Sequence, residues 1–176
     1  MRAAVFHGAG DVRIEAVAAP GDPGPGEVLC APSMAAICGT EASEYAHGPH
    51  MIPLHKRQPG SGNVGPLVLG HEFVGRVEAV GDGVESLAVG DRVVSGAGVS
   101  CGECAWCRAG RTNLCASYYT LGLSAPGGLA EQVMSPASIC VPVPDAVADV
   151  GAAMAQPLAV AIHALDRGGV GPGQTV

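Results

Sequence analysis

Four closely spaced cysteines are the residues in this sequence best suited to bind a metal ion. They follow the pattern C-x2-C-x2-C-x7-C and comprise Cys101, Cys104, Cys107 and Cys115. Four thiolates complete the tetrahedral coordination of zinc and leave no position for water or substrate, which is typical of a structural site. Iron–sulfur clusters use other common spacings, often with proline after the last cysteine, whereas Ala116 follows here. We therefore expect residues 98–116 to form a lobe around one structural zinc ion, with unliganded loop cysteines as the alternative.

Two further motifs offer a different set of metal donors. The first is Cys38-Gly39-Thr40, and the second is Gly70-His71-Glu72. Together they supply a thiolate, an imidazole and a carboxylate, a set that suits a catalytic zinc site with a position left for water or substrate. A lone histidine at the start of a strand is more often structural, so the residues alone leave both interpretations open.

Composition excludes several classes of protein. Hydrophobic residues make up 48% of the chain and charged residues 14%, which predicts a folded core. The net charge is −7 and no cluster of basic residues occurs, so we expect no nucleic-acid partner. The sequence has no signal-peptide pattern and no apolar run near the ~18–20 residues that cross a membrane, so we expect a cytoplasmic protein without a membrane partner. In a reducing compartment, seven cysteines indicate metal binding more than disulfides.

Short apolar segments between Gly-rich turns predict a mainly β fold, a barrel or sandwich, with short helices. The expected strands are Arg2–His7, Val12–Val17, Glu27–Ile37, His71–Val80 and Leu129–Ser135. A short helix is expected at Glu41–His47, followed by an irregular Gly/Pro-rich segment at Gly48–Pro66. An Ala-rich helix is expected within Val147–Asp166, starting near Pro157, and a new strand is expected to begin at Gln174.

The order of these motifs resembles the zinc-dependent medium-chain alcohol dehydrogenase family. Gly90-Asp91-Arg92-Val93 lies between the two catalytic-type motifs and the cysteine lobe, as in that family. The resemblance implies a GroES-like β-barrel catalytic domain at residues 1–155. It also implies a linking helix and the start of a dinucleotide-binding domain at 156–176, with the chain cut off before that Rossmann domain. The segment containing Gly48-Pro49 and Ile52-Pro53 is most similar to the 2,3-butanediol and polyol dehydrogenase branch.

The resemblance also assigns roles to individual residues. It implies that Cys38 and His71 are catalytic-zinc ligands, that Glu72 is a ligand or an outer group, and that Thr40 passes on the substrate proton. Gln156 stands where the branch usually has glutamate and other members have cysteine. Its neutral amide could bind a water or the metal weakly, or only begin a helix. Ser43 stands where a relay histidine is often found.

The function implied is oxidation of a secondary alcohol to a ketone, with hydride transfer to a nicotinamide cofactor. The expected cofactors are one structural zinc, one catalytic zinc, and NAD or NADP; the expected substrate is a small alcohol or polyol. We identify no dinucleotide fingerprint, a G-x-G-x-x-G that follows a strand and opens a helix. The chain alone is therefore expected to be inactive, and its apolar C-terminal surface makes a homo-oligomer possible.

A non-catalytic, zinc-stabilised binding or scaffold domain is the alternative function. The metal content helps to distinguish the two, because two zinc ions per chain support a catalytic-type site, whereas one supports the scaffold or a catalytic site that has lost its metal. Quinone and enoyl reductases of the same superfamily are disfavoured, because they generally lack both the cysteine lobe and the Cys38/His71 pair.

Overall fold

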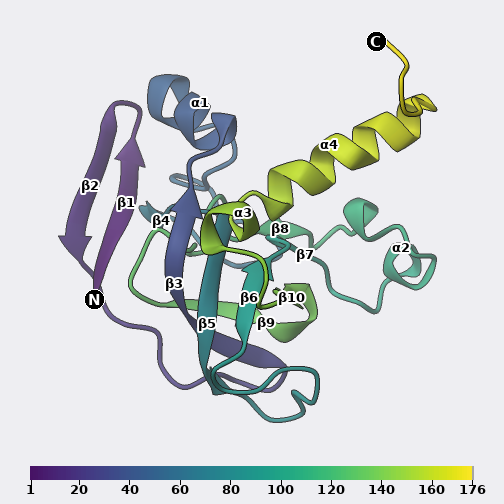
Figure 1. Cartoon of the computed structure of the whole chain (residues 1–176). Coiled ribbons are helices and arrows are strands. Elements are labelled where there is room, and N and C mark those ends of the chain that lie inside the picture. The colour runs from purple at the N-terminus through teal and green to yellow at the C-terminus, as the bar shows by residue number, and fades with distance from the viewer. Residues whose placement is uncertain (176) are drawn as a thin grey trace.

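The computed structural model describes residues 1–175 and shows a mainly β chain with short helices, as the sequence predicts (Figure 1). The strands are β1 Arg2–Gly8, β2 Asp11–Ala16, β3 Glu27–Ala36, β4 Leu67–Val68, β5 Glu72–Val80, β6 Arg92–Ser95, β7 Gly98–Val99, β8 Tyr119–Thr120, β9 Val133–Pro136 and β10 Cys140–Pro142. The α-helices are α1 Gly39–His47, α2 Ala105–Arg108, α3 Asp149–Ala152 and α4 Ala155–Gly168. Short 3-10 turns occur at Thr112–Leu114 and Ala137–Ile139. None of the described helices is long and apolar enough to span a membrane.

A five-stranded antiparallel sheet forms the centre of the molecule, in the order β10-β6-β5-β3-β9. Its longest pairing runs between β3 and β5, where Ala36 lies opposite Glu72. The pairing contains two bulges, one at Glu78 of β5 and one at Ser33 of β3, and both bend the sheet because a bulge increases local twist. The sheet is therefore curled, and a three-stranded sheet of order β2-β1-β4 packs beside it.

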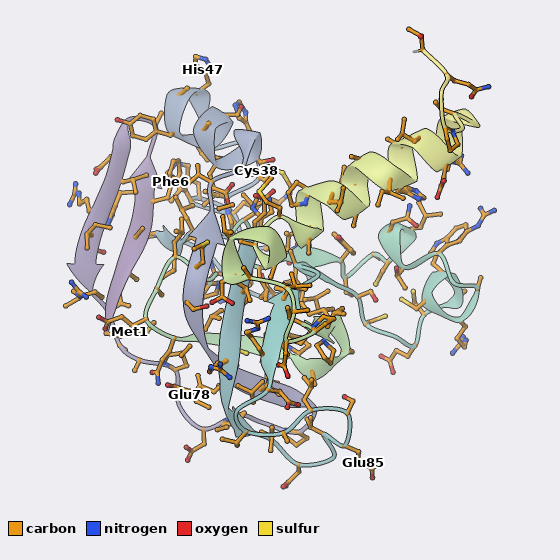
Figure 2. The ribbon with its side chains drawn as sticks, in the orientation of Figure 1. Met1, Phe6, Cys38, His47, Glu78 and Glu85 are labelled. Atoms are coloured by element: carbon orange, nitrogen blue, oxygen red, sulfur yellow. The ribbon has the colours of Figure 1, made fainter. Side chains whose placement is uncertain are left out.

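Two phenylalanines lie at the centre of the two largest apolar clusters. Phe73 packs with valines of the five-stranded sheet, and Phe6 packs with Ile52, Leu67 and Leu69. Phe6 points from β1 into the interior (Figure 2). Both rings are at most 1% exposed, so each buries the large apolar area that stabilises a core poor in aromatic residues. The packing of Ile52 anchors the irregular segment after α1 to this core.

The segment 48–66 is irregular, as predicted, but one glutamine holds it firmly. The Gln58 Oε1 atom accepts hydrogen bonds from the N–H groups of Gly60 and Ser61, at 2.5 and 2.6 Å. Its Nε2 atom donates to the carbonyl of Tyr118 at 2.8 Å. A Cβ atom on Gly60 would lie 2.0 Å from the Ser117 carbonyl oxygen. The segment is therefore docked on the chain just after the cysteine lobe.

Residues Gly60–Gly65 spell G-x-G-x-x-G, a match that the sequence analysis missed. The string lies in the irregular segment between α1 and β4, and no helix follows it. It therefore lacks the strand-to-helix turn that places a pyrophosphate at a helix N-terminus.

The helix start expected near Pro157 is confirmed, because α4 begins at Ala155, and the Ala-rich residues before it form the separate short helix α3. Pro157 lies in the first turn of α4, where its missing N–H has no helical acceptor. Helix α4 projects from the body of the molecule (Figure 1). The expected strand start at Gln174 is wrong for Gln174 and Thr175, which are in no strand, while Val176 lies outside the described residues.

Candidate metal centres

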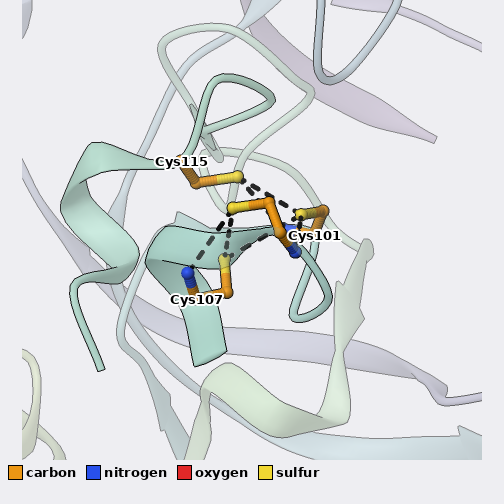
Figure 3. Close-up of side chains that lie close together, drawn as sticks. Cys101, Cys107 and Cys115 are labelled. Carbon is orange, nitrogen blue, oxygen red and sulfur yellow. Dashed lines mark hydrogen bonds between the residues drawn. The ribbon is translucent and has the colours of Figure 1, made fainter. Parts of the chain in front are cut away.

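The four cysteines of the lobe converge on one point (Figure 3). The Sγ atoms of Cys104 and Cys107 are 3.5 Å apart, and those of Cys101 and Cys115 are also 3.5 Å apart. Cys101 and Cys107 are separated by 3.9 Å. Tetrahedral zinc with Zn–S bonds of ~2.3 Å requires sulfur atoms roughly 3.8 Å apart. The arrangement therefore fits a closed four-thiolate zinc site.

Backbone N–H groups prepare these sulfur atoms to bind a cation. The N–H of Cys101 donates to Cys115 Sγ, and the N–H of Cys104 donates to Cys101 Sγ, both at 3.4 Å. Hydrogen bonds from the backbone N–H groups of Glu103 and Cys104 lower the pKa of Cys101 to about 7. Loss of solvent raises the pKa of Cys107 to about 11. A metal ion would displace the proton that Cys107 retains near neutral pH.

A second cluster forms where α1 meets the start of β5. Ligand atoms of Cys38, Glu41 and His71 all lie within 4.8 Å of one another. Cys38 caps the N-terminus of α1 and lies at the base of this helix (Figure 2). His71 directly precedes β5, and Gly70 before it has a φ of +102°, a conformation that side chains rarely adopt. A Cβ atom on Gly70 would also lie 2.5 Å from the Leu129 nitrogen.

Glu41 is the residue of this cluster that sequence reasoning missed. Its Oε1 atom is 2.5 Å from His71 Nδ1, and its Oε2 atom accepts from the Cys38 N–H at 3.0 Å. The His71 and Glu41 side chains are only 5% and 2% exposed. A carboxylate can only accept, so Nδ1 carries the proton and the Nε2 lone pair is available to a metal. The sequence feature that could have identified Glu41 is its i, i+3 spacing from Cys38, which places it over the helix N-terminus.

Glu72 provides an independent indication that a cation belongs in this cluster. Its Oε1 atom lies 3.8 Å from His71 Nε2. This oxygen is buried and has no hydrogen-bond partner among the described residues. A buried carboxylate oxygen without a partner is costly. The Cys38 thiol, the free His71 nitrogen and this oxygen therefore fit the mixed donor set of a zinc ion.

The other predicted site residues lie at different distances from this cluster. Thr40 is close, because its Oγ1 atom is 3.7 Å from Cys38 Sγ. Gln156 is half-buried in the first turn of α4 and lines a cavity of about 550 Å³ with Ser95 and Tyr118. Its side chain makes no hydrogen bond within the part of the chain that the structure describes. Ser43 is exposed on the surface of α1.

Several known proteins resemble this chain in sequence. The family described as the alcohol dehydrogenase GroES-like domain matches residues 24–145. The sorbitol dehydrogenase of Bombyx mori is 38% identical over 166 residues, which are 94% of this chain and 45% of that protein. Thus the chain spans less than half the length of this relative.

Two solved structures extend the similarity to three dimensions. The 2R,3R-butanediol dehydrogenase of Bacillus subtilis has a TM-score of 0.85 and 34% identity, covering 94% of this chain and 46% of that one. The alcohol dehydrogenase RspB of Escherichia coli CFT073, in complex with NADH, has a TM-score of 0.81 and 35% identity. That match covers 96% of this chain and 46% of the other. The similarity therefore includes nearly all of this chain and less than half of either neighbour.

Proposed function

Because this chain belongs to the family of zinc-dependent medium-chain alcohol and polyol dehydrogenases, we propose that it supplies the metal- and substrate-binding domain of such an enzyme. The GroES-like domain of that family matches residues 24–145. The proposed reaction converts a secondary alcohol and NAD(P)⁺ into a ketone, NAD(P)H and a proton. The observation that carries the proposal is the convergence of half-buried Cys38 with buried Glu41 and His71. Beside it, 3.8 Å from His71 Nε2, lies a Glu72 carboxylate oxygen that has no hydrogen-bond partner within residues 1–175.

We assign the metal-holding atoms to Cys38 Sγ, His71 Nε2 and Glu72 Oε1. A zinc ion held there would act as a Lewis acid and make a substrate hydroxyl more acidic. Glu41 keeps the proton on His71 Nδ1 and fixes the orientation of the ring, because its carboxylate lies 2.5 Å away. This arrangement keeps the Nε2 lone pair aimed at the donor cluster.

Thr40 is the group placed to receive the substrate proton. Its hydroxyl lies 3.7 Å from the Cys38 sulfur, so a substrate oxygen in the cluster would be within reach of it. The hydroxyl can accept that proton in a hydrogen bond and pass its own proton outward. Loss of the proton raises the electron density on the alcohol and favours departure of hydride from the adjacent carbon. Ser43, on the exposed side of α1, offers no imidazole to continue the relay.

Gln156 gives the proposed site a neutral amide where related sequences place a charged group. Its position in the first turn of α4, beside a cavity, suits a side chain that hydrogen-bonds substrate or water. We therefore assign it to substrate positioning and leave the metal to Cys38, His71 and Glu72. The hydride acceptor, NAD or NADP, we assign to residues beyond the 176 of this chain, since its relatives are more than twice as long.

Cobalt substitution tests the proposed site without requiring turnover. Co²⁺ replaces zinc at tetrahedral thiolate sites and gives visible absorption that reports the number and type of ligands. We expect two ions per chain, and one after His71→Ala. His47→Ala is the matched control, because His47 is exposed in the last turn of α1, at the opposite end of the helix from Cys38, and it should leave both ions bound. A single ion in the unaltered chain, unaffected by His71→Ala, would support the scaffold alternative instead.

A further inference from the structure

Strand β2 forms an open edge of the molecule. It is the outer strand of the sheet of order β2-β1-β4, and Figure 1 shows the β1–β2 hairpin at one side of the fold with no strand beyond it. Ile14, near the middle of β2, has 73% of its surface exposed. An edge strand with free N–H and C=O groups can pair with another strand.

The hydrogen bonds of β1 show which groups of β2 face outward. Ala4 lies opposite Ile14. The Ala4 N–H donates to the Leu129 carbonyl at 2.8 Å, and its carbonyl accepts from the Leu69 N–H at 3.0 Å. The backbone groups of Ala4 therefore face away from β2, and Ala4–Ile14 is a non-hydrogen-bonded pair. By alternation, Val12, Ile14 and Ala16 direct their N–H and C=O groups to the open side.

An antiparallel pair of β2 strands brings outward-facing groups opposite each other when it is centred on any residue from 12 to 16. Centring on Ile14 pairs all three outward-facing residues, whereas centring on Arg13 or Glu15 pairs two of them and centring on Val12 or Ala16 pairs one. Centring on Arg13 sets arginine opposite arginine and Asp11 opposite glutamate. Centring on Glu15 sets glutamate opposite glutamate. Both registers place like charges in directly opposed positions, which is destabilising.

The register centred on Ile14 is complementary in every pair. Val12 lies opposite Ala16 and the two exposed Ile14 side chains meet, and these pairs exchange the backbone hydrogen bonds. Arg13 of each copy lies opposite Glu15 of the other, in non-hydrogen-bonded pairs where side chains approach most closely. Within one chain, Arg13 binds Asp11 at 2.7 Å, so in the dimer its guanidinium would lie between two carboxylates.

We propose that a second copy of this chain docks on the β2 edge in this register and joins the two three-stranded sheets into one. The complementarity depends on the alternation of acidic and basic residues about an exposed isoleucine, which an antiparallel copy of the same strand matches pair by pair. The partner is therefore another copy of the chain, through a contact with two-fold symmetry.

Sedimentation velocity of the full chain over a range of concentrations tests this proposal. We expect a concentration-dependent monomer–dimer equilibrium. Arg13→Glu sets glutamate opposite Glu15 twice per dimer and should weaken association by about tenfold or more. Glu15→Arg should do the same, and the double variant Arg13→Glu/Glu15→Arg restores opposite charges and should recover most of the affinity. Failure of the double variant to recover, or a monomer at all concentrations, would overturn the proposal.

A proline substitution and an amide-exchange measurement separate this edge from other surfaces. Ile14→Pro removes an outward N–H without breaking a β1–β2 hydrogen bond, a position at which edge strands tolerate proline. It should abolish association while circular dichroism stays unchanged. The amides of Val12, Ile14 and Ala16 should gain protection as concentration rises. If Ile162→Asp on α4 abolishes association and Ile14→Pro does not, the α4 face is the contact and the proposal is wrong.

Discussion

Replacing Glu41 tests how the chain prepares His71 for a metal. Glu41→Gln keeps the side-chain volume and an acceptor for the His71 Nδ1 proton, but it removes the charge that strengthens this 2.5 Å contact. Glu41→Ala removes the contact entirely and also frees the Cys38 N–H. Loss of such an outer partner typically lowers metal affinity 10–100-fold, which is roughly 1.4–2.7 kcal/mol. We expect Glu41→Ala near the upper end of this range and Glu41→Gln near the lower end.

Competition with a chromophoric chelator measures this change directly. The cysteine lobe serves as an internal reference, because substitution of Glu41 should not change its affinity for metal. Glu44→Gln is the matched control: Glu44 is also buried on α1, but its carboxylate accepts from the N–H groups of His50 and Met51. It should lower stability by about 1–3 kcal/mol and leave metal affinity unchanged. Equal metal affinity in Glu41→Ala and the unaltered chain would refute the orienting role of Glu41.

Three other outcomes follow from the same contacts. Gln58→Ala should lower the free energy of urea unfolding by about 1–3 kcal/mol, because two backbone donors and the Tyr118 carbonyl lose their partner. An unfolding free energy equal to that of the unaltered chain would show that the docking is unimportant. Gly70→Ala should lower the free energy of unfolding by about 2 kcal/mol or more, because Gly70 has a positive φ and lies close to the Leu129 nitrogen. Gly83→Ala is the control, since Gly83 also has a positive φ but faces open space. Equal melting temperatures for the two variants would contradict the role of close packing. The purified 176-residue chain should not reduce NAD⁺ or NADP⁺ with sorbitol or butanediol, and steady production of reduced nicotinamide at 340 nm would show that the cofactor site lies within it.

The sequence allowed the metal-binding lobe to be predicted because its ligands are local. Four cysteines within one short segment define their own geometry, and the structure brings the four sulfur atoms together as expected. Most of the longer strands were predictable for a similar reason, since alternation and Gly-rich turns act over a few residues, but the strand expected at Leu129–Ser135 is found at Val133–Pro136. The strand expected at Glu27–Ile37 is found at Glu27–Ala36.

Contacts between distant segments were not predictable in the same way. Glu41 meets His71 only because β3 and β5 pair in a register that sets the start of α1 against the start of β5. The docking of Gln58 on Tyr118 depends on where the lobe leaves the sheet, and no local pattern specifies that.

A crystal structure with anomalous scattering recorded on both sides of the zinc absorption edge tests the central claim most directly. The account predicts two zinc peaks per chain. One lies among the four cysteine sulfurs, and the other lies within bonding distance of Cys38 Sγ and His71 Nε2, with Glu41 still on Nδ1. A peak in the lobe alone, or a second ion bound through His71 Nδ1, would contradict it.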